Sequence, residues 1–139
     1  MNNTINRVNQ SNIGFGMNLK YGEGIDSLVT EFPQIQEGAK RAKDVIEKME
    51  PFCDVLIKEG PSIKGLKTIL LSLPEKDVPL AAEDLTSKPE TVATDFPLGI
   101  EIYLKNSARK LSQEYKKFVE VEREALREGF IEPTFIKMG

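Results

Sequence analysis

Apolar residues in the last third of the chain follow two different periods. In residues 96–104 they occupy every second position, a pattern that is typical of a half-buried strand. From Asn106 or Ser107 onward they recur at intervals of three and four until Gly129, which predicts one long amphipathic helix. The strand and the helix would each present one apolar face, and we expect these two faces to pack on each other.

Residues 96–104 also allow a second interpretation, in which they form the first turns of a helix. That helix would begin at Pro97, with Asp95 as its cap. Gly99 would weaken such a helix, and the apolar positions keep a two-residue period. The pattern therefore favours the strand.

Three segments nearer the N-terminus carry local patterns of their own. Apolar residues alternate with others in residues 13–21, which predicts a strand that its two glycines weaken. Asp26 is suited to cap a short helix that runs to Phe32. Residues 34–50 contain a helical apolar stripe, and Pro51 is expected to stop that helix.

The middle of the chain predicts a β-hairpin. Residues 52–59 and 66–73 each have strand character, and glycine and proline lie between them. Apolar residues on both sides of the second strand place it inside the sheet. The resulting order, β-α-β-β-β-α, predicts an α+β fold. It would be a small, mostly antiparallel sheet with two helices on one face, the C-terminal helix being the long one.

A length of 139 residues suits one domain. Residues 1–12 are rich in asparagine and predict a disordered N-terminal arm. Residues 13–129 carry all the predicted elements and form the single α+β domain. Residues 130–139 are an apolar C-terminal tail that Pro133 keeps non-helical.

Residues 74–95 form an acidic segment that contains three prolines. Its excess of acidic residues is larger than that of the whole chain, whose net charge is -3. Loops of this length without structure are uncommon in compact domains. Two interpretations stay open, a short helix around residues 81–85 or a mobile loop that acts as a lid over a ligand.

The composition excludes several classes of function. Without histidine, and with Cys53 as the single cysteine, the chain lacks the set of ligands for structural zinc and the usual general base. The glycines of residues 14–16 and 22–24 do not complete a phosphate-binding motif. No basic face, signal peptide or membrane span is visible. We expect no cofactor, no nucleic-acid or membrane partner, and a cytoplasmic location.

The potentially reactive side chains of the sequence do not form a recognisable catalytic motif. Cys53 has no histidine to activate it, so we interpret it as a small core residue. Glu101 is a nominal carboxylate on the outer face of the predicted strand. Tyr103 lies on the same face and is expected to be exposed, whereas Tyr115 falls in the helical stripe and is expected in the core. An enzyme is therefore not predicted.

Glu122 lies where the helical stripe calls for an apolar residue. A buried carboxylate is costly unless it is paired. Either the stripe leaves the core there and Glu122 is solvated, or Glu122 pairs with a basic residue across an interface and fixes its register.

The apolar tail also has two interpretations, because it either folds back on the domain or docks on a partner. Its candidate interaction residues are Phe130, Ile131, Phe135 and Ile136.

These observations favour a non-enzymatic domain that binds another protein or self-assembles through its long helix and tail. The alternative is a regulatory domain that binds a small molecule, with residues 74–95 as its lid. The identity of the partner or ligand is not encoded in any motif of the chain.

Overall fold

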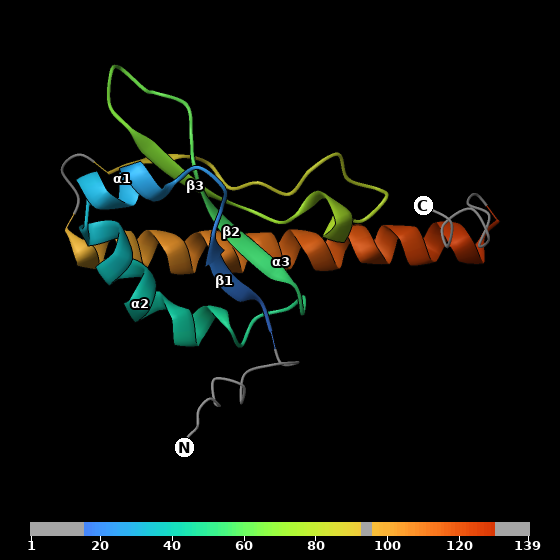
Figure 1. The fold of residues 1–139 in the computed structure, drawn as a ribbon. Coiled ribbons are helices and arrows are strands. Elements are labelled where there is room, and N and C mark those ends of the chain that lie inside the picture. The colour runs from blue at the N-terminus through green and yellow to red at the C-terminus, as the bar shows by residue number, and fades with distance from the viewer. Residues whose placement is uncertain (1–15, 93–95, 130–139) are drawn as a thin grey trace.

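The computed structural model of the protein describes residues 16–92 and 96–129 (Figure 1). The strands are β1 (Asn18–Tyr21), β2 (Asp54–Glu59), β3 (Thr68–Ser72) and β4 (Glu90–Thr91). The helices are α1 (Asp26–Glu31), α2 (Gln34–Ile46), the short 3-10 helix η2 (Glu75–Asp77) and α3 (Pro97–Arg127). The predicted arm and tail, together with residues 13–15, lie outside the described residues.

The four strands form one mixed sheet in the order β1-β2-β3-β4. β1 pairs with β2 in parallel, and the two following pairs are antiparallel. The α+β class, the hairpin of β2 and β3, and the interior place of β3 are thus confirmed. Helix α2 is also confirmed, although it ends at Ile46, well before Pro51. In α1, Asp26 is the first helical residue, and the preceding Ile25 occupies the cap position.

The prediction of a strand at residues 96–104 is wrong, because α3 already begins at Pro97. Ile100 and Leu104 are fully buried, and they continue a helical series with Ala108 and Leu111. Leu98 and Ile102, which shared the two-residue period, are 56% and 49% exposed. Residues 100 and 104 are four positions apart, which is a helical spacing, and the exposed apolar residues between and before them made the pattern look like a strand. The fourth strand of the sheet is instead the short β4.

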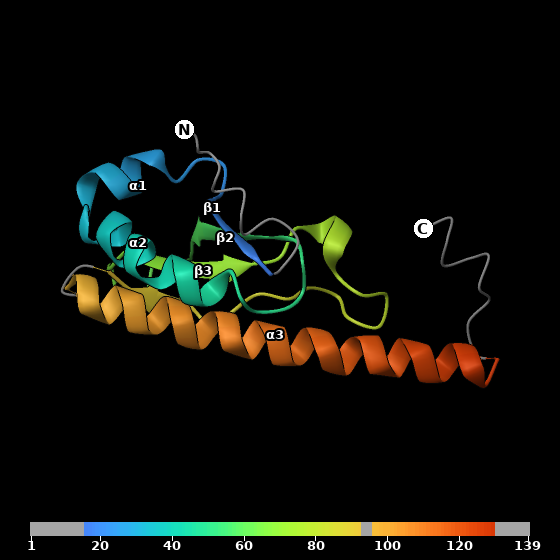
Figure 2. The ribbon, with the colours of Figure 1, turned by 90° about the horizontal axis from the view of Figure 1, so that it is seen from below.

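Helices α2 and α3 cover one face of the sheet and pack closely on each other (Figure 2). The covered face carries Leu19, Val55, Ile57 and Leu71, which lie beside one another in the strand register. At the helix crossing, a Cβ atom on Gly38 would lie 2.6 Å from the Cβ of Ile100. Glycine is therefore required there for the backbones to come so close.

Residues 74–85, called the strap from here on, leave β3 and return to it as a closed loop. The amide of Leu73 donates to the carbonyl of Leu85 at 3.0 Å, which closes the loop at its base. The strap contains η2 near its start and a turn at its tip, where the amide of Ala82 donates to the carbonyl of Pro79 at 3.0 Å. A helix around residues 81–85 is not present, so that interpretation of the acidic segment is wrong.

Candidate functional site

Helix α3 extends well beyond the sheet that its first half covers (Figures 1 and 2). Its last fully packed positions are Leu111 and Ser112. Residues 113–127, called the overhang from here on, contain no buried residue. Apolar side chains nevertheless continue at helical spacing along the overhang and are only half-buried: Tyr115, Phe118, Val119, Ala125 and Leu126. This apolar stripe thus lies largely outside the core of the domain.

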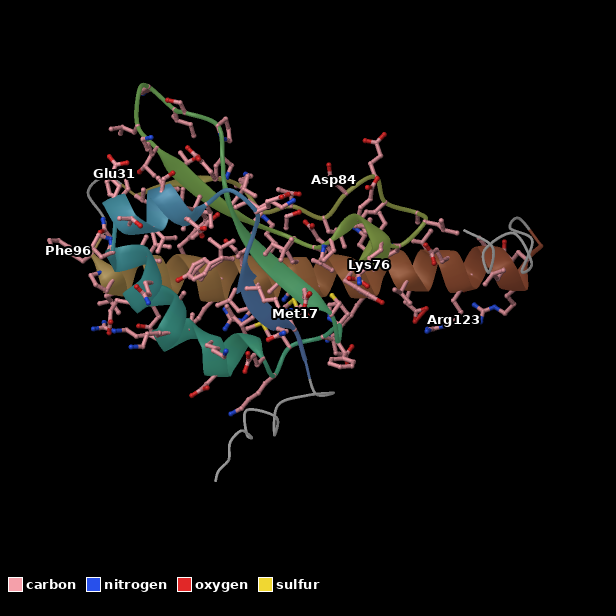
Figure 3. All side chains as sticks on the ribbon, in the orientation of Figure 1. Met17, Glu31, Lys76, Asp84, Phe96 and Arg123 are labelled. Carbon is pink, nitrogen blue, oxygen red and sulfur yellow. The ribbon has the colours of Figure 1, made fainter. Side chains whose placement is uncertain are left out.

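A hydrogen bond joins the tip of the strap to the overhang. The backbone amide of Ala81 donates to Oε2 of Glu122 at 3.0 Å, across 41 positions of sequence. The sequence offered two interpretations of Glu122, solvation or pairing with a basic residue across an interface. This contact is neither of them, because it lies within one chain and its donor is a backbone amide. In Figure 3, Lys76 and Asp84 mark the strap and Arg123 marks the overhang. The carboxylate that interrupts the apolar stripe is thereby satisfied by the strap.

Tyr115 lies at the junction of the strap, the overhang and the start of β2. Burial raises the pKa of its hydroxyl, and charge at Cys53, Asp77 and Glu122 raises it further, in that order. Tyr115 also belongs to the half-buried side chains that pack against the hydrophobic core. Its predicted place in the core is therefore only half realised, because its side chain packs against the core but stays half-buried.

A groove of about 480 Å³ runs along one side of the overhang. One wall is the turn from Glu50 to Phe52, and the other wall comes from α3 through Tyr115, Lys116, Val119, Glu120 and Arg123. Phe52 is 63% exposed, although it is a large apolar side chain. The sequence pattern around Phe52 indicates only the start of a strand, so the exposure of this side chain was not predicted.

A second cavity, of about 520 Å³, also has Phe52 in its wall. The body of the domain contributes Lys43, Phe52, Cys53 and Asp54, and η2 contributes Lys76 and Asp77. The acidic strap, for which a lid is one interpretation, thus supplies two charged residues to the wall of this cavity. The wall of this cavity therefore combines opposite charges with one aromatic ring, that of Phe52.

Cys53 lines this cavity, but its thiol is not activated. Burial raises the pKa of Cys53 to about 12, and the carboxylates of Asp77 and Asp54 add to the effect. The thiol is therefore protonated near neutral pH, and a protonated thiol is a poor nucleophile. This environment argues against thiolate catalysis at Cys53.

Glu101 and Tyr103 are positioned by α3 and not by a strand. The carboxylate of Glu101 pairs with Nζ of Lys105 at 2.7 Å, one helical turn away. The hydroxyl of Tyr103 lies 2.6 Å from the carbonyl oxygen of Lys88 and 3.1 Å from that of Ile69. The predicted exposure of Tyr103 is wrong, because its ring is half-buried and its hydroxyl fastens α3 to the sheet.

Two further classes of site can be judged within residues 16–92 and 96–129. That part of the chain has no group of three or more acidic or cysteine side chains placed to hold a metal ion. None of its helices is long and apolar enough to cross a membrane. The tail residues predicted for interaction, Phe130, Ile131, Phe135 and Ile136, lie outside the described residues.

No protein-family model, no curated protein and no solved structure matches the chain. No activity, ligand or partner therefore carries over from a relative. The overhang, its groove and the cavity beside η2 are the features that bear on function.

Proposed function

We propose that the protein is a non-enzymatic domain that self-associates through the overhang of α3. The proposal depends on one observation, namely that the apolar stripe of this helix extends further than its buried positions. Buried positions stop at Ser112, whereas apolar residues keep their helical spacing as far as Leu126. Most of the stability of a helix in a protein comes from packing of its apolar face and not from its own hydrogen bonds. A second copy would supply that packing.

The fold limits how two copies can meet. The first half of α3 is covered by α2 and the sheet on the side that carries Ile100 and Leu104. Two helices placed in parallel, apolar face to apolar face, would bring these two bodies into collision. An antiparallel overlap of the two overhangs keeps the bodies at opposite ends, and it has the twofold symmetry that is commonest among homodimers.

Substitution of Leu126 tests this proposal. Leu126→Lys places a charge on the apolar stripe of the overhang, and we expect it to convert the associated protein to a monomer. The matched control is Val121→Lys, on the same helix but at a side chain that is already 50% exposed. Light scattering after size exclusion should show association for the parent and Val121→Lys only. Equal molar mass for both variants would contradict the proposal.

A chain that ends at Gly129 separates the overhang from the tail. If the truncated chain still associates, the contact lies in the overhang, as proposed. If truncation alone gives a monomer, the apolar residues after Gly129 carry the association, and the proposal in this form is wrong. A melting temperature that is unchanged by truncation would show that the domain itself has remained intact.

A small-molecule-binding function is the second candidate, and the cavity beside η2 favours it. Lys76 and Asp77 place part of the strap at this cavity, as a lid would require. A thermal-shift screen with nucleotides and polar metabolites tests it, because a ligand that binds only the folded state raises the melting temperature until the site is saturated. No saturable shift across such a library would count against this candidate.

The proposal also includes a cytoplasmic location. It is supported by the single cysteine of the chain, whose thiol is free. Proteins that lack disulfides are typical of reducing compartments. Fractionation of cells that express the full-length protein would test this location, and recovery from a membrane or secreted fraction would contradict it.

A further inference from the structure

The strap is held at its base by several hydrogen bonds, and its residues 80 and 81 are exposed where it meets the overhang. At the base, Leu73 pairs with Leu85, and the hydroxyl of Thr86 donates to that of Ser72 at 3.2 Å. Beyond the base, Val78 packs against the core. At the tip Pro79 is buried, whereas Leu80 and Ala81 are exposed, and the hydrogen bond from Ala81 to Glu122 joins this exposed part to the overhang.

The point where the tip meets α3 lies in the middle of the apolar stripe. Glu122 comes between Val119 and Leu126, both of which belong to the half-buried side of the overhang. A second overhang laid along this stripe would need the space that the strap tip occupies. The strap and a second copy of the protein therefore cannot pack on this part of α3 at the same time.

We propose that the strap is a latch that opposes self-association, and that Glu122 holds it closed through the amide of Ala81. This inference rests on the proposed self-association of the overhang. In the closed state the strap tip covers the middle of the stripe within one chain. Release of the hydrogen bond frees the tip, and a second overhang then packs on the exposed positions. The strength of association is thus set by how firmly the latch is closed.

Two substitutions of Glu122 test the latch by its hydrogen bond. Glu122→Ala removes the acceptor, whereas Glu122→Gln keeps a neutral amide oxygen in its place. We expect the association constant of Glu122→Ala to rise about 25-fold, because both latches of an antiparallel pair must open and each contributes about fivefold, the net free energy of one hydrogen bond. Glu122→Gln should stay close to the parent. The matched control is Glu120→Ala, which removes the same charge from an exposed residue that pairs with Arg123 in its own helix.

Sedimentation equilibrium over a range of concentrations gives these constants, and hydrogen exchange reports on the strap itself. Amide exchange within residues 79–84 should become faster in Glu122→Ala and remain unchanged in Glu120→Ala, since the tip is exposed once it is released. Exchange is measured at a concentration low enough for every variant to be a monomer, so that this readout depends on the strap alone. It is therefore not affected by the more apolar surface that alanine creates on the stripe.

A covalent lock provides a test within one protein. Ala81→Cys and Glu122→Cys, combined with Cys53→Ala, allow a short bismaleimide to join the strap tip to α3. We expect the joined protein to be a monomer. The control is Glu122→Cys with Cys53→Ala, carrying the same reagent on its single thiol with the far end capped. This control should still associate, because its strap is free.

The outcomes separate the latch from the self-association on which it rests. Tighter association of Glu122→Ala, together with a monomeric locked protein, supports the latch. An unchanged or weaker association of Glu122→Ala, in a parent that associates, overturns the latch but leaves the self-association standing. Monomers for the parent and for every unlocked variant, at the highest concentration, overturn both.

Discussion

Gly38 lies where α2 and α3 come closest, and we expect Gly38→Ala to destabilise the protein. In a helix exposed to solvent the same change would be favourable by about 1 kcal/mol, because alanine is the better helix former. Here the added Cβ would lie 2.6 Å from both Cβ and Cγ2 of Ile100, and 3.0 Å from the amide nitrogen of Glu101. Carbon atoms in contact are normally about 3.5–4.0 Å apart.

The neighbours of this new Cβ cannot move aside by a simple side-chain rotation. The Cβ of Ile100 and the amide of Glu101 are fixed by the backbone of α3, so the two helices must separate. Inserting a methyl group into such a packed contact costs about 1–3 kcal/mol. After the gain of about 1 kcal/mol in helix propensity is subtracted, we expect the free energy of unfolding to fall by up to about 2 kcal/mol.

Urea denaturation followed by circular dichroism measures this change. Lys40→Ala, at an exposed position of the same helix, is the control and should stay within about 0.5 kcal/mol of the parent. The slope of the transition should not change, because the exposed surface of the unfolded chain is the same. A Gly38→Ala protein that is more stable than the parent, by the amount that helix propensity alone provides, would refute the close packing of α2 on α3.

Two further predictions concern single side chains. The folded protein should keep the thiol proton of Cys53 up to a pKa of about 12, against a usual 9.0, so stability should fall as the pH rises above about 9. Alkylation at pH 8 should be much slower in the folded than in the urea-unfolded protein, and equal rates would contradict the burial of the thiol. Tyr103→Phe should lower the free energy of unfolding by about 1–2 kcal/mol in urea titrations, since it removes the contacts to the carbonyls of Lys88 and Ile69. No change would show that these contacts add nothing.

The elements that the sequence predicted correctly depend on local patterns. The stripe of α2 repeats over several turns, and it leads to buried residues such as Ile35, Ala42 and Ile46. In the hairpin, the alternation of Val55 and Ile57 along β2 matches their burial. Such patterns need no knowledge of distant partners, because the same few residues specify both the element and its buried face.

The beginning of α3 shows why the same logic fails elsewhere. Leu98, Ile100, Ile102 and Leu104 satisfy a two-residue period, yet Ile100 and Leu104 also satisfy the four-residue period of a helix. The choice between the two was made by packing, since α2 covers only the helical subset. Tertiary contacts thus overrode the weak preference that Gly99 introduces against a helix.

The candidate site was predicted only in part, for a similar reason. Glu122 was recognisable as an exception within the stripe, because a single position of a regular pattern was occupied by a carboxylate. Its partner was not recognisable, since the amide of Ala81 is a backbone group and any non-proline residue of the chain could have supplied it. Phe52 was missed because exposure of one large side chain depends on how its neighbours pack.

The late position of α3 in the chain has a consequence for synthesis. Ile100, Leu104, Ala108 and Leu111 close the apolar face of the sheet and the stripe of α2. A ribosome makes these residues only after it has made β1 to β4 and α2. The nascent chain therefore carries its sheet and its first helices with their apolar faces still open, as a substrate for chaperones. Folding is completed in one late step, when the first half of α3 docks on the elements made before it.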